Sequence, residues 1–416
     1  FNKVSLNKMI AEVWENWKSV FVPIMILFLV GALAGTWLVS GIIPAMVYYG
    51  LQVLSPAIFL PASVIIAAII SIATGSSWTT SATVGIALIG IGSALGIPTG
   101  MIAGAVISGA YFGDKMSPLS DTTNLAPAMA GTDLFTHIKY MAYTTVPTII
   151  ITLIVFAILS GTIDTTGNAD ISNLLASINN TFNITPWLFL VPGIVIAMIL
   201  MKTKPLVALG IGVLLAAVFA FIFQGDVLES LSTSKFQAII NSILVDTNIQ
   251  TDDEKLSELF SSGGMNGMLW TIFLIICAMV FGGVMDAIGA LAKITKSLLA
   301  VATSVFGLFA STVVSCLGLN IVASDQYLAL VIPGKMFKKA YEDKGLAPEN
   351  LSRTLEDSGT VTSVLIPWNT CGAYQSGVLG VDVGDYFFYA IFNYLSPIMT
   401  LLFAAFNLKI RMIIKK

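Results

Sequence analysis

The chain has 416 residues, of which 56% are hydrophobic and only 10% are charged, and its formal net charge is −3. Soluble domains carry roughly 25% charged residues. Several segments run for about 18 residues or more without a formal charge, which is long enough to cross a bilayer as a helix. The composition therefore excludes a soluble domain and predicts an all-α polytopic membrane protein. A β-barrel is disfavoured, because barrel strands alternate apolar and polar residues over about 10 positions.

Few residues are suited to metal or redox chemistry. The three cysteines, Cys277, Cys316 and Cys371, lie far apart without metal-ligand spacing, so we interpret them as small apolar residues in packed helices. The single histidine, His137, lies in a polar linker, and metal sites normally cluster several ligands. We therefore expect neither a cofactor nor a catalytic metal centre.

The apolar runs predict the membrane segments in chain order. They cover residues 20–39, 57–73, 82–95, 99–112, 140–160, 186–201, 205–223, 267–288, 297–317, 321–333, 361–367 and 386–407. Loops rich in Lys and Arg stay on the cytoplasmic side of a membrane. The linkers 202–204, 293–296 and 335–353 and the C-terminal tail are basic, whereas the linkers 161–185 and 224–265 are acidic. We expect the basic linkers and the C-terminus to be cytoplasmic and the acidic linkers to be external.

The order of runs and breaks occurs twice along the chain. In the first copy, two runs precede the polar break TGSSWTTSAT, a further run, the segment SGAYFGDKMSPLSDTTN and a last long run. In the second copy, two long runs precede the polar break LGLNIVASDQ, an apolar run, the segment DSGTVTSVLIPWNTCG and a last long run. In both copies a Ser-Gly pair precedes a proline by about ten residues. The chain therefore contains an internal repeat.

The two copies are expected to run in opposite directions through the membrane. The element 99–130 ends at a linker with Lys139, so it enters the cytoplasm, whereas the element 351–376 begins at a basic linker and leaves it. Inverted repeats with interrupted helices are typical of secondary transporters, and the interruptions mark the binding site. The sequence thus predicts inverted repeats with broken helices and re-entrant hairpins.

The repeat sets the expected domain boundaries. We predict a first inverted repeat at 1–160, an external linker at 161–185 and a second inverted repeat at 186–416. The two runs at the start of the second repeat have no counterpart in the first. About two further helices, roughly 40 residues, are therefore expected ahead of Phe1.

Four polar breaks interrupt the apolar runs, at 74–81, 113–124, 318–326 and 367–372. Non-helical backbone at membrane depth survives only inside the protein or beside water. Freed carbonyls and half-helix ends can bind a cation. Sodium, as a hard cation, prefers oxygen ligands by the same logic as calcium and magnesium. The sequence therefore predicts a cation site built from these breaks.

Asp121 is the main candidate for this site. It follows Pro118 and begins a new segment, and carboxylates inside a membrane are functional by default. Lys115 is interpreted as a residue that tunes the carboxylates or as a countercharge for Asp121. The further oxygen ligands expected around a sodium ion at Asp121 are Asp114, Ser117, Thr122, Thr123 and Asn124 from the same break and Thr79, Thr80, Asp325, Asn369 and Thr370 from the other breaks.

Structural interpretations stay open for several of these residues. Ser and Thr in membrane helices often only hydrogen-bond the preceding turn. Asp114 and Lys115 are also compatible with an interfacial pair at a loop end, where charges reach water easily. Glu356 and Asp357 begin an element, and we interpret them as a helix-end feature. Arg353 is assigned to the basic linker.

Other functional classes fit the chain less well. It contains no G-x-x-x-x-G-K-[ST] loop, so it does not hydrolyse ATP by a P-loop. An intramembrane aspartyl protease needs a carboxylate dyad, which would have to come from polar linkers such as YFGD and VGDYF. A channel would carry ohmic rather than coupled, saturable flux, and repeated broken helices favour a carrier. We therefore expect a transporter rather than an enzyme.

Three stretches of the chain carry a family resemblance. They are ATGSSWTTSATVGIALIGIG, ISGAYFGDKMSPLSDTTNLAPAMAGTDLFTHIKYM and LEDSGTVTSVLIPWNTCGAYQSGVLGV. The chain resembles the NhaC-type sodium/proton antiporter family of the ion transporter superfamily along essentially its whole length. The resemblance implies exchange of sodium for protons across a bacterial inner membrane. The family also includes a branch that exchanges malate and protons for lactate and sodium.

Sodium and protons are thus the expected transported species, in a chain surrounded by bilayer lipid and without a nucleic-acid partner. Malate and lactate, and a second copy of the chain in a homodimer, are open alternatives. The expected mechanism is alternating access around a carboxylate that holds either a proton or a sodium ion. An organic anion is not expected to be required, because Arg, the usual bidentate partner of a carboxylate, is absent from the breaks.

Overall fold

The computed structural model describes residues 4–163, 171–201, 203–252, 254–300 and 302–413, and helices form most of it. In these ranges six helices are long and apolar enough to cross a membrane, and two bent helix pairs raise the number to eight. The six helices are α1 (Leu6–Val39), α3 (Pro56–Thr74), α8 (Leu134–Thr162), α11 (Pro205–Phe223), α15 (Leu269–Ala287) and α17 (Val305–Val322). The prediction of an all-α polytopic membrane protein with broken helices is confirmed.

The remaining elements lie between these helices or follow the last of them. Between α1 and α8 lie α2 (Ile42–Val53), α4 (Ser77–Thr80), the π-helix η1 (Ser81–Gly85), α5 (Ile86–Ala94), α6 (Thr99–Met116) and α7 (Asp121–Ala130). Between α8 and α15 lie α9 (Ile171–Thr181), η2 (Pro186–Phe189), α10 (Leu190–Leu200), α12 (Gly225–Leu231), α13 (Lys235–Leu244), α14 (Glu254–Leu259), η3 (Asn266–Met268) and an antiparallel pair of strands, β1 (Thr247–Asn248) and β2 (Ser261–Ser262). After α15 come α16 (Ala290–Ala300), α18 (Gln326–Asp343), α19 (Pro348–Leu355), the π-helix η4 (Glu356–Thr360), η5 (Ser363–Leu365), α20 (Thr370–Leu379), α21 (Val383–Tyr386), η6 (Phe387–Tyr389) and α22 (Ile391–Ala405).

A similar succession of elements occurs in both halves of the chain. The first consists of α3, a break, α4 to α5, α6, a break, α7 and α8. The second consists of α17, a break, α18, α19 with η4, a break, α20 and α21 to α22. α7 and α20, which follow corresponding breaks, have ten residues each. The repeat boundaries 1–160 and 186–416 and the opposite directions of the two copies stay predictions.

The expected external linker 161–185 is only partly described. Residues 164–170 lie outside the described residues, as do Phe1, Lys202 and the tail residues 414–416. α9 forms within the linker and meets the η2–α10 segment at an angle of 84°. This part of the linker is therefore helical rather than extended.

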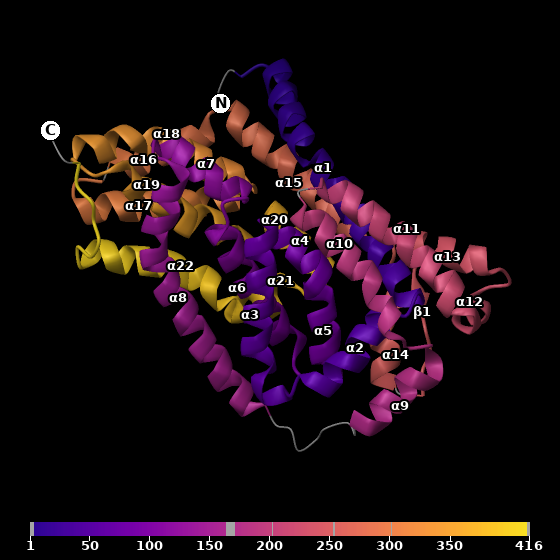
Figure 1. The fold of residues 1–416 in the computed structure, drawn as a ribbon. Helices are drawn as coiled ribbons and strands as arrows, with labels where there is room; N and C mark the ends of the chain where they lie inside the picture. The colour runs from indigo at the N-terminus through magenta and orange to yellow at the C-terminus, as the bar shows by residue number, and fades with distance from the viewer. Residues whose placement is uncertain (1–3, 164–170, 202, 253, 301, 414–416) are drawn as a thin grey trace.

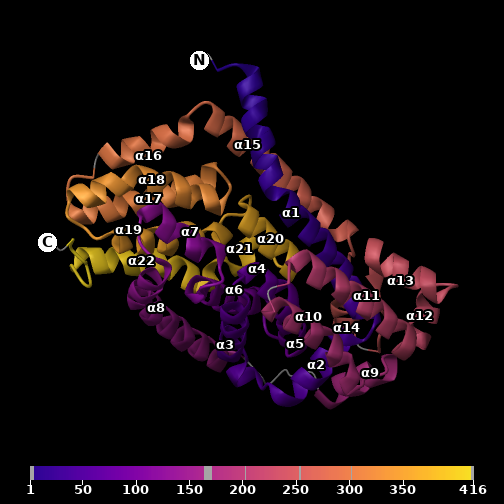
Figure 2. The ribbon, with the colours of Figure 1, turned by 45° about the horizontal axis from the view of Figure 1, so that its top comes forward.

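The two ends of the molecule differ in charge. α16, α18 and the C-terminal end of the chain lie together at one end, whereas α9, α12, α13 and α14 lie at the other (Figures 1 and 2). The first group carries lysines of the linkers 293–296 and 335–353, and the second carries acidic residues of 224–265. This separation is what the expected membrane orientation requires. The orientation itself stays a prediction.

The outer helices present large apolar side chains to their surroundings. Ile65 and Ile69 of α3, Ile154 and Ile158 of α8 and Phe221 of α11 are all exposed. Soluble monomers rarely expose large contiguous apolar surfaces. On helices of membrane-spanning length, such side chains are expected to contact lipid tails.

α6 packs closely against α3 near the centre of the molecule (Figure 1). Gly109 and Gly113 form a G-x-x-x-G motif on α6, and a Cβ atom at Gly109 would come within 2.2 Å of the Val64 carbonyl oxygen. The Ser71 hydroxyl donates a hydrogen bond across the same interface to the Ala110 carbonyl oxygen at 2.6 Å. The helix pair therefore depends on small residues, as is common for helices packed in a membrane.

Replacing Gly109 with valine should destabilise this helix pair. The added side chain would overlap the α3 backbone, and overpacking typically costs about 1–3 kcal/mol. The thermal midpoint of the detergent-solubilised protein should fall. Gly210→Val in α11 is the control, because a Cβ atom there meets nothing within 4 Å. Equal midpoints for the two variants would contradict the packing argument.

Candidate functional site

Four breaks interrupt the helices in or beside the predicted polar segments. They comprise residues 75–76, 117–120, 323–325 and 361–369, and the last begins before the predicted segment 367–372. After each break, the next helix begins with a side chain that accepts a hydrogen bond from a backbone N–H of its first turn. These capping residues are Ser76, Ser120, Asp325 and Asn369. The caps satisfy backbone donors that lipid cannot satisfy.

The two breaks of the second half lie side by side. Asp325 and Asn369 each accept a backbone N–H of their own helix through Oδ1 at 3.0 Å. The Thr370 N–H donates to the Ser324 carbonyl oxygen, also at 3.0 Å. Ser324 has a left-handed backbone with φ 60°, which is uncommon for a residue other than glycine. The structure thus brings Asp325, Asn369 and Thr370 together and uses the first two as helix caps.

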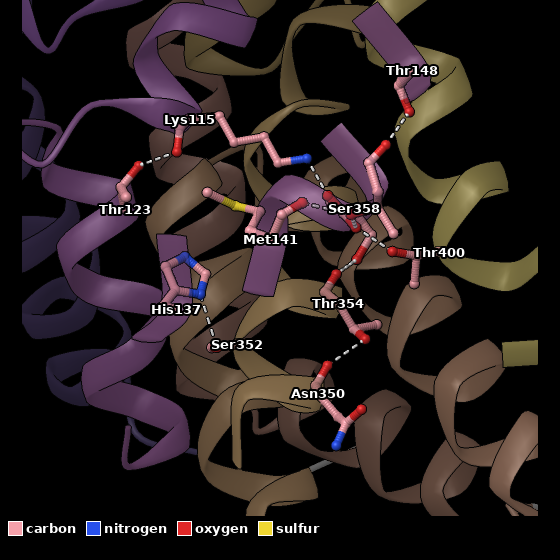
Figure 3. Close-up of polar contacts among 12 residues, drawn as sticks. Lys115, Thr123, His137, Met141, Thr148, Asn350, Ser352, Thr354, Ser358 and Thr400 are labelled. Carbon is pink, nitrogen blue, oxygen red and sulfur yellow. Dashed lines mark hydrogen bonds and ion pairs between the residues drawn. The ribbon is translucent and has the colours of Figure 1, made fainter. Parts of the chain in front are cut away.

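The polar side chains of the break at 117–120 bond mainly to nearby backbone. The Thr123 hydroxyl donates to the Lys115 carbonyl oxygen at 3.1 Å (Figure 3). The Ser117 hydroxyl donates to a carbonyl oxygen of α3 at 2.8 Å, and Asn124 Nδ2 donates to the Ser120 carbonyl oxygen at 2.7 Å. These side chains satisfy backbone carbonyl oxygens at the break, and none of these bonds involves Asp121.

The remaining hydroxyls of the predicted site behave in the same way. The Thr80 hydroxyl donates to the Ser76 carbonyl oxygen at 2.9 Å, and the Thr79 hydroxyl lies 3.1 Å from Ser76 Oγ. The Thr122 hydroxyl lies 3.2 Å from the Ser120 hydroxyl. The structural role of Ser and Thr in membrane helices thus accounts for these contacts.

Asp121 is exposed in the structure, at the first turn of α7. In this conformation the Asp121 side chain is therefore accessible rather than enclosed by the other predicted ligands. Its charge interacts with Asp114 and with the Tyr327 phenol, which also interacts with Asp325. Asp121 thus lies in the region of Asp114 and Tyr327, with its own side chain exposed.

Asp114 lies at the end of α6 and is half-buried. Its Oδ2 atom accepts two hydrogen bonds from Ser77, one from the backbone N–H at 3.1 Å and one from the hydroxyl at 2.7 Å. Ser77 is the first residue of α4, so the carboxylate also faces the positive end of that helix. The Ser120 hydroxyl lies beside the same carboxylate. Asp114 therefore has oxygen atoms from both breaks of the first half around it.

Lys115 pairs with Asp357 of the second half, not with Asp121. Both side chains are completely buried. The Thr144 hydroxyl of α8 donates to Asp357 Oδ2 at 2.9 Å, and the Thr400 hydroxyl of α22 donates to the same oxygen (Figure 3). The expectation that Lys115 acts on Asp121 is corrected. A buried ion pair, with two further hydrogen bonds to Asp357, joins α6, α8, η4 and α22.

Glu356, Asp357 and Arg353 are buried completely, although the sequence suggested a helix-end feature and a basic linker. The guanidinium carbon of Arg353 lies 4.6 Å from the centre of the Tyr140 ring and 5.8 Å from that of Phe403. The three guanidinium nitrogens have no hydrogen-bond partner among the described residues. Arg353 is therefore a charged group inside the helix bundle.

His137 is a buried residue of α8 rather than a linker residue. Its Nδ1 atom lies 2.8 Å from the Ser352 hydroxyl of α19 (Figure 3). α8 begins at Leu134, before the predicted apolar run 140–160, so the sequence placed His137 outside the helix that contains it. The histidine therefore links α8 to α19 through Ser352, the residue that precedes Arg353.

Contacts between α4 and α20 join the breaks of the two halves. The rings of Trp78 and Tyr374 stack with their centres 3.9 Å apart and an interplanar angle of 19°. The Tyr374 hydroxyl donates to the Trp78 carbonyl oxygen at 3.2 Å. Together with the Lys115–Asp357 pair, this contact links the helix breaks into one central region.

The buried ion pair should be needed for stability as a pair. Lys115→Met and Asp357→Asn should each destabilise the protein by about 3–5 kcal/mol, because either change leaves one buried charge unpaired. The double variant should lose less than the sum of the two. Thermal unfolding in detergent measures this as a double-mutant cycle.

The partly exposed pair between Lys235 and Glu229, at 3.0 Å, supplies the control for this cycle. Lys235→Met should change stability by about 1 kcal/mol or less, as is usual for solvent-exposed pairs. Additive losses for Lys115→Met and Asp357→Asn would contradict a direct energetic coupling between the two buried residues.

Comparisons with known proteins identify relatives along most of the chain. A family model described as "Na+/H+ antiporter family" matches residues 109–408. The Na(+)/H(+) antiporter NhaC of Alkalihalophilus pseudofirmus is 39% identical over 401 residues, which cover 96% of this chain and 85% of that protein. The malate-2H(+)/Na(+)-lactate antiporter of Bacillus subtilis is 39% identical over 391 residues, which cover 93% of this chain and 80% of that protein. The solved structure of Neisseria gonorrhoeae MtrF aligns with a TM-score of 0.44 and 14% identity, covering 96% of this chain and 84% of that one.

The matched family region contains much of the site described above. Residues 109–408 include three of the four helix breaks and both members of the buried ion pair. The sequence relatives extend over nearly the whole chain and most of their own length. The chain belongs to the Na+/H+ antiporter family.

Proposed function

We infer that the chain is a secondary active transporter that exchanges sodium for protons across a bacterial inner membrane by alternating access. One observation carries this inference: a buried lysine–carboxylate pair joins the two halves beside the helix breaks in a chain of the Na+/H+ antiporter family. Ionisable groups inside a membrane mark ion pathways and proton relays. The relative from Alkalihalophilus pseudofirmus is named for the same exchange.

The proposal assigns the sodium ion to Asp114 rather than to Asp121. Asp114 is half-buried between the hydroxyls of Ser77 and Ser120. Carboxylate and hydroxyl oxygens are suitable ligands for a hard cation. Asp121 is exposed and its charge reaches Asp114, so it attracts a cation to the entrance of the site. The proposal thus moves the central role from Asp121 to Asp114, which the sequence analysis had placed among the surrounding ligands.

Alternating access needs one part of the protein to move against another around the bound ion. In this chain the Lys115–Asp357 pair joins α6 to η4, and the Trp78–Tyr374 stack joins α4 to α20. Any movement of the two halves must therefore preserve or exchange these contacts. The proposed orientation has the basic end and the C-terminus in the cytoplasm, following the distribution of Lys and Arg.

Exchange that includes an organic acid is the second candidate function. The Bacillus subtilis relative is named as an antiporter of malate and lactate. The expectation that no organic anion is required rested on the absence of arginine from the breaks. Arg353 weakens that reason, because it is buried in α19 with guanidinium nitrogens that no described residue hydrogen-bonds.

Asp114→Asn should abolish sodium-driven proton movement in proteoliposomes, because it removes the proposed ligand charge and keeps the side-chain size. Asp121→Asn should retain exchange and weaken the apparent sodium affinity by about tenfold or less, as expected for an entrance charge. Proton flux is measured against sodium concentration at several pH values.

In the unmodified protein the sodium affinity should weaken as pH falls, since the two cations compensate the same negative charge. Near-normal exchange in Asp114→Asn, or a sodium affinity that does not depend on pH, would contradict this assignment.

Sodium alone should drive proton movement in vesicles that contain no organic acid. The reason is that the proposed site is built from carboxylate and hydroxyl oxygens, which bind cations. Malate and lactate are added separately, inside or outside the vesicles, to the same preparation. Proton movement that requires either acid would establish the second candidate, and Arg353→Gln would then test whether the buried guanidinium takes part.

A further inference from the structure

Glu356 is a buried carboxyl group that the proposed sodium site does not use. It begins the π-helix η4 and is completely buried. Neither of its carboxyl oxygens has a hydrogen-bond partner among the described residues. The hydroxyls of Thr122 and Thr360 lie beside it without meeting hydrogen-bond geometry, and Asp114 and Lys115 interact with it electrostatically.

An ionised carboxylate is unstable in these surroundings. Burying a charge without hydrogen bonds or a partner is strongly unfavourable, and such groups become neutral instead. Lys115, the cation that interacts with Glu356, is already paired with Asp357. A protonated carboxyl group carries no charge and can be buried there. These surroundings therefore favour the protonated form of Glu356.

Five charged groups of α6, α19 and η4 balance one another when Glu356 is protonated. Lys115 and Arg353 are two cations, and Asp114 and Asp357 are two carboxylates. A protonated Glu356 leaves this group without net charge, whereas an ionised Glu356 leaves one negative charge in excess. One monovalent cation, either a proton on Glu356 or a sodium ion beside Asp114, restores the balance.

We propose that Glu356 carries the transported proton and that its protonation excludes sodium from Asp114. This inference rests on the proposed sodium/proton exchange and names the residue that binds the proton. Sodium beside Asp114 neutralises the charge that repels an ionised Glu356, so the carboxyl group loses its proton to water. Reprotonation of Glu356 makes the sodium ion a surplus positive charge and expels it. The proton and the sodium ion therefore compete without sharing a ligand.

The local backbone suits a group that changes charge. π-Helical turns inside α-helices are rare and frequently occur at functional sites. Arg353 lies one turn before Glu356, in a position from which residues three apart on a helix can interact. Its guanidinium group contacts the Tyr140 and Phe403 rings and has no hydrogen-bond partner among the described residues. Arg353 is thus available as a countercharge when Glu356 ionises.

Other titratable and charged groups lie on the elements around η4, and the pH dependence has to be separated from theirs. Asp114 and Lys115 lie on α6, and Asp357 belongs to η4 itself. The neighbouring elements and their caps also carry, among others, Asp121 on α7, His137 and Tyr140 on α8, Cys316 on α17, Asp325 at the start of α18, Tyr327 and Tyr341 on α18, Arg353 on α19 and Tyr394 on α22. Replacing Glu356 alone, with these groups unchanged, isolates its contribution.

Infrared difference spectroscopy tests the protonation of Glu356 without requiring transport. The spectrum of the purified, full chain is recorded while sodium replaces a large inert cation at constant pH. The unmodified protein should lose the carbonyl stretching band of a protonated carboxyl group when sodium is added. Glu356→Gln should show no such loss, because its side chain is neutral with and without sodium.

Transport is then measured on the same variants. Glu356→Gln should fold, because this conformation already holds a neutral side chain, and its sodium-driven proton movement should fall to the level of protein-free vesicles. Its sodium affinity should be weaker than that of the unmodified protein and should no longer depend on pH. Glu349→Gln is the matched control on the same helix, where Glu349 pairs with Arg411 at 2.6 Å. This control should keep the infrared band, the exchange and the pH dependence.

Two results would overturn the inference. One is the absence of a sodium-sensitive band in the unmodified protein, and the other is an unchanged band or exchange rate in Glu356→Gln. If Glu356→Gln does not fold, Glu356→Asp is used instead, because it keeps a carboxyl group. Its carbonyl stretching band and the pH profile of its exchange must both be shifted. An unchanged band and an unchanged profile would again refute the assignment. An unmodified protein without any sodium-driven proton movement would contradict the proposed exchange itself, while the infrared measurement still decides whether Glu356 is the protonated group.

Discussion

Helix breaks inside a membrane leave backbone donors and acceptors that no water reaches, and the rest of this structure depends on how the chain satisfies them. Here a short polar side chain caps each of the four helices that follow a break. Further hydroxyls, such as those of Ser117 and Thr123, bond to the carbonyl oxygens left at the ends of the preceding helices. The need to hydrogen-bond these backbone groups therefore accounts for the abundance of Ser, Thr and Asn at the breaks without any reference to function.

This structural demand separates the buried polar residues into two groups. Side chains such as Asp325 and Asn369 each accept a backbone N–H group through Oδ1. Glu356 and Arg353 satisfy no backbone group, and their polar atoms lack hydrogen-bond partners among the described residues. Burial without a hydrogen-bond partner is unfavourable for stability. Glu356 and Arg353 are therefore the buried residues for which a function other than stabilising the fold is expected.

The sequence predicted the helix breaks well because their causes are local. Glycine, proline and capping residues act within a few positions of the chain, and all four breaks lie in or next to the predicted segments. The partners across the site could not be predicted in the same way. Lys115 pairs with Asp357 across 242 positions, and no local pattern distinguishes that partner from Asp121. The charges of Arg353, Glu356 and Asp357 suggested a surface next to the basic linker, whereas packing against α6, α8 and α22 buries them.

The same local reasoning explains why the sequence analysis centred the expected site on Asp121 rather than on Asp114. A carboxylate after a proline break looks desolvated when only its neighbours in the chain are considered. In the structure it occupies the first turn of α7, where an acidic side chain is favoured by the helix dipole and remains exposed. Asp114, seven positions earlier on α6, turns towards α4 instead and accepts both hydrogen bonds of Ser77.

In the proposed exchange, charge balance would also supply the coupling. With one monovalent cation bound, Lys115, Arg353, Asp114, Asp357 and Glu356 carry no net charge together, whether that cation is a proton or a sodium ion. An empty site would leave a negative charge, and a doubly occupied site a positive one, in an interior where uncompensated charge is far less stable than in water. The singly loaded forms are therefore the ones that can rearrange between the two sides of the membrane. A carrier limited to those forms must bind the second ion after it has released the first, before its site can face the other side of the membrane again. Exchange is then obligatory, and leakage of either ion is suppressed.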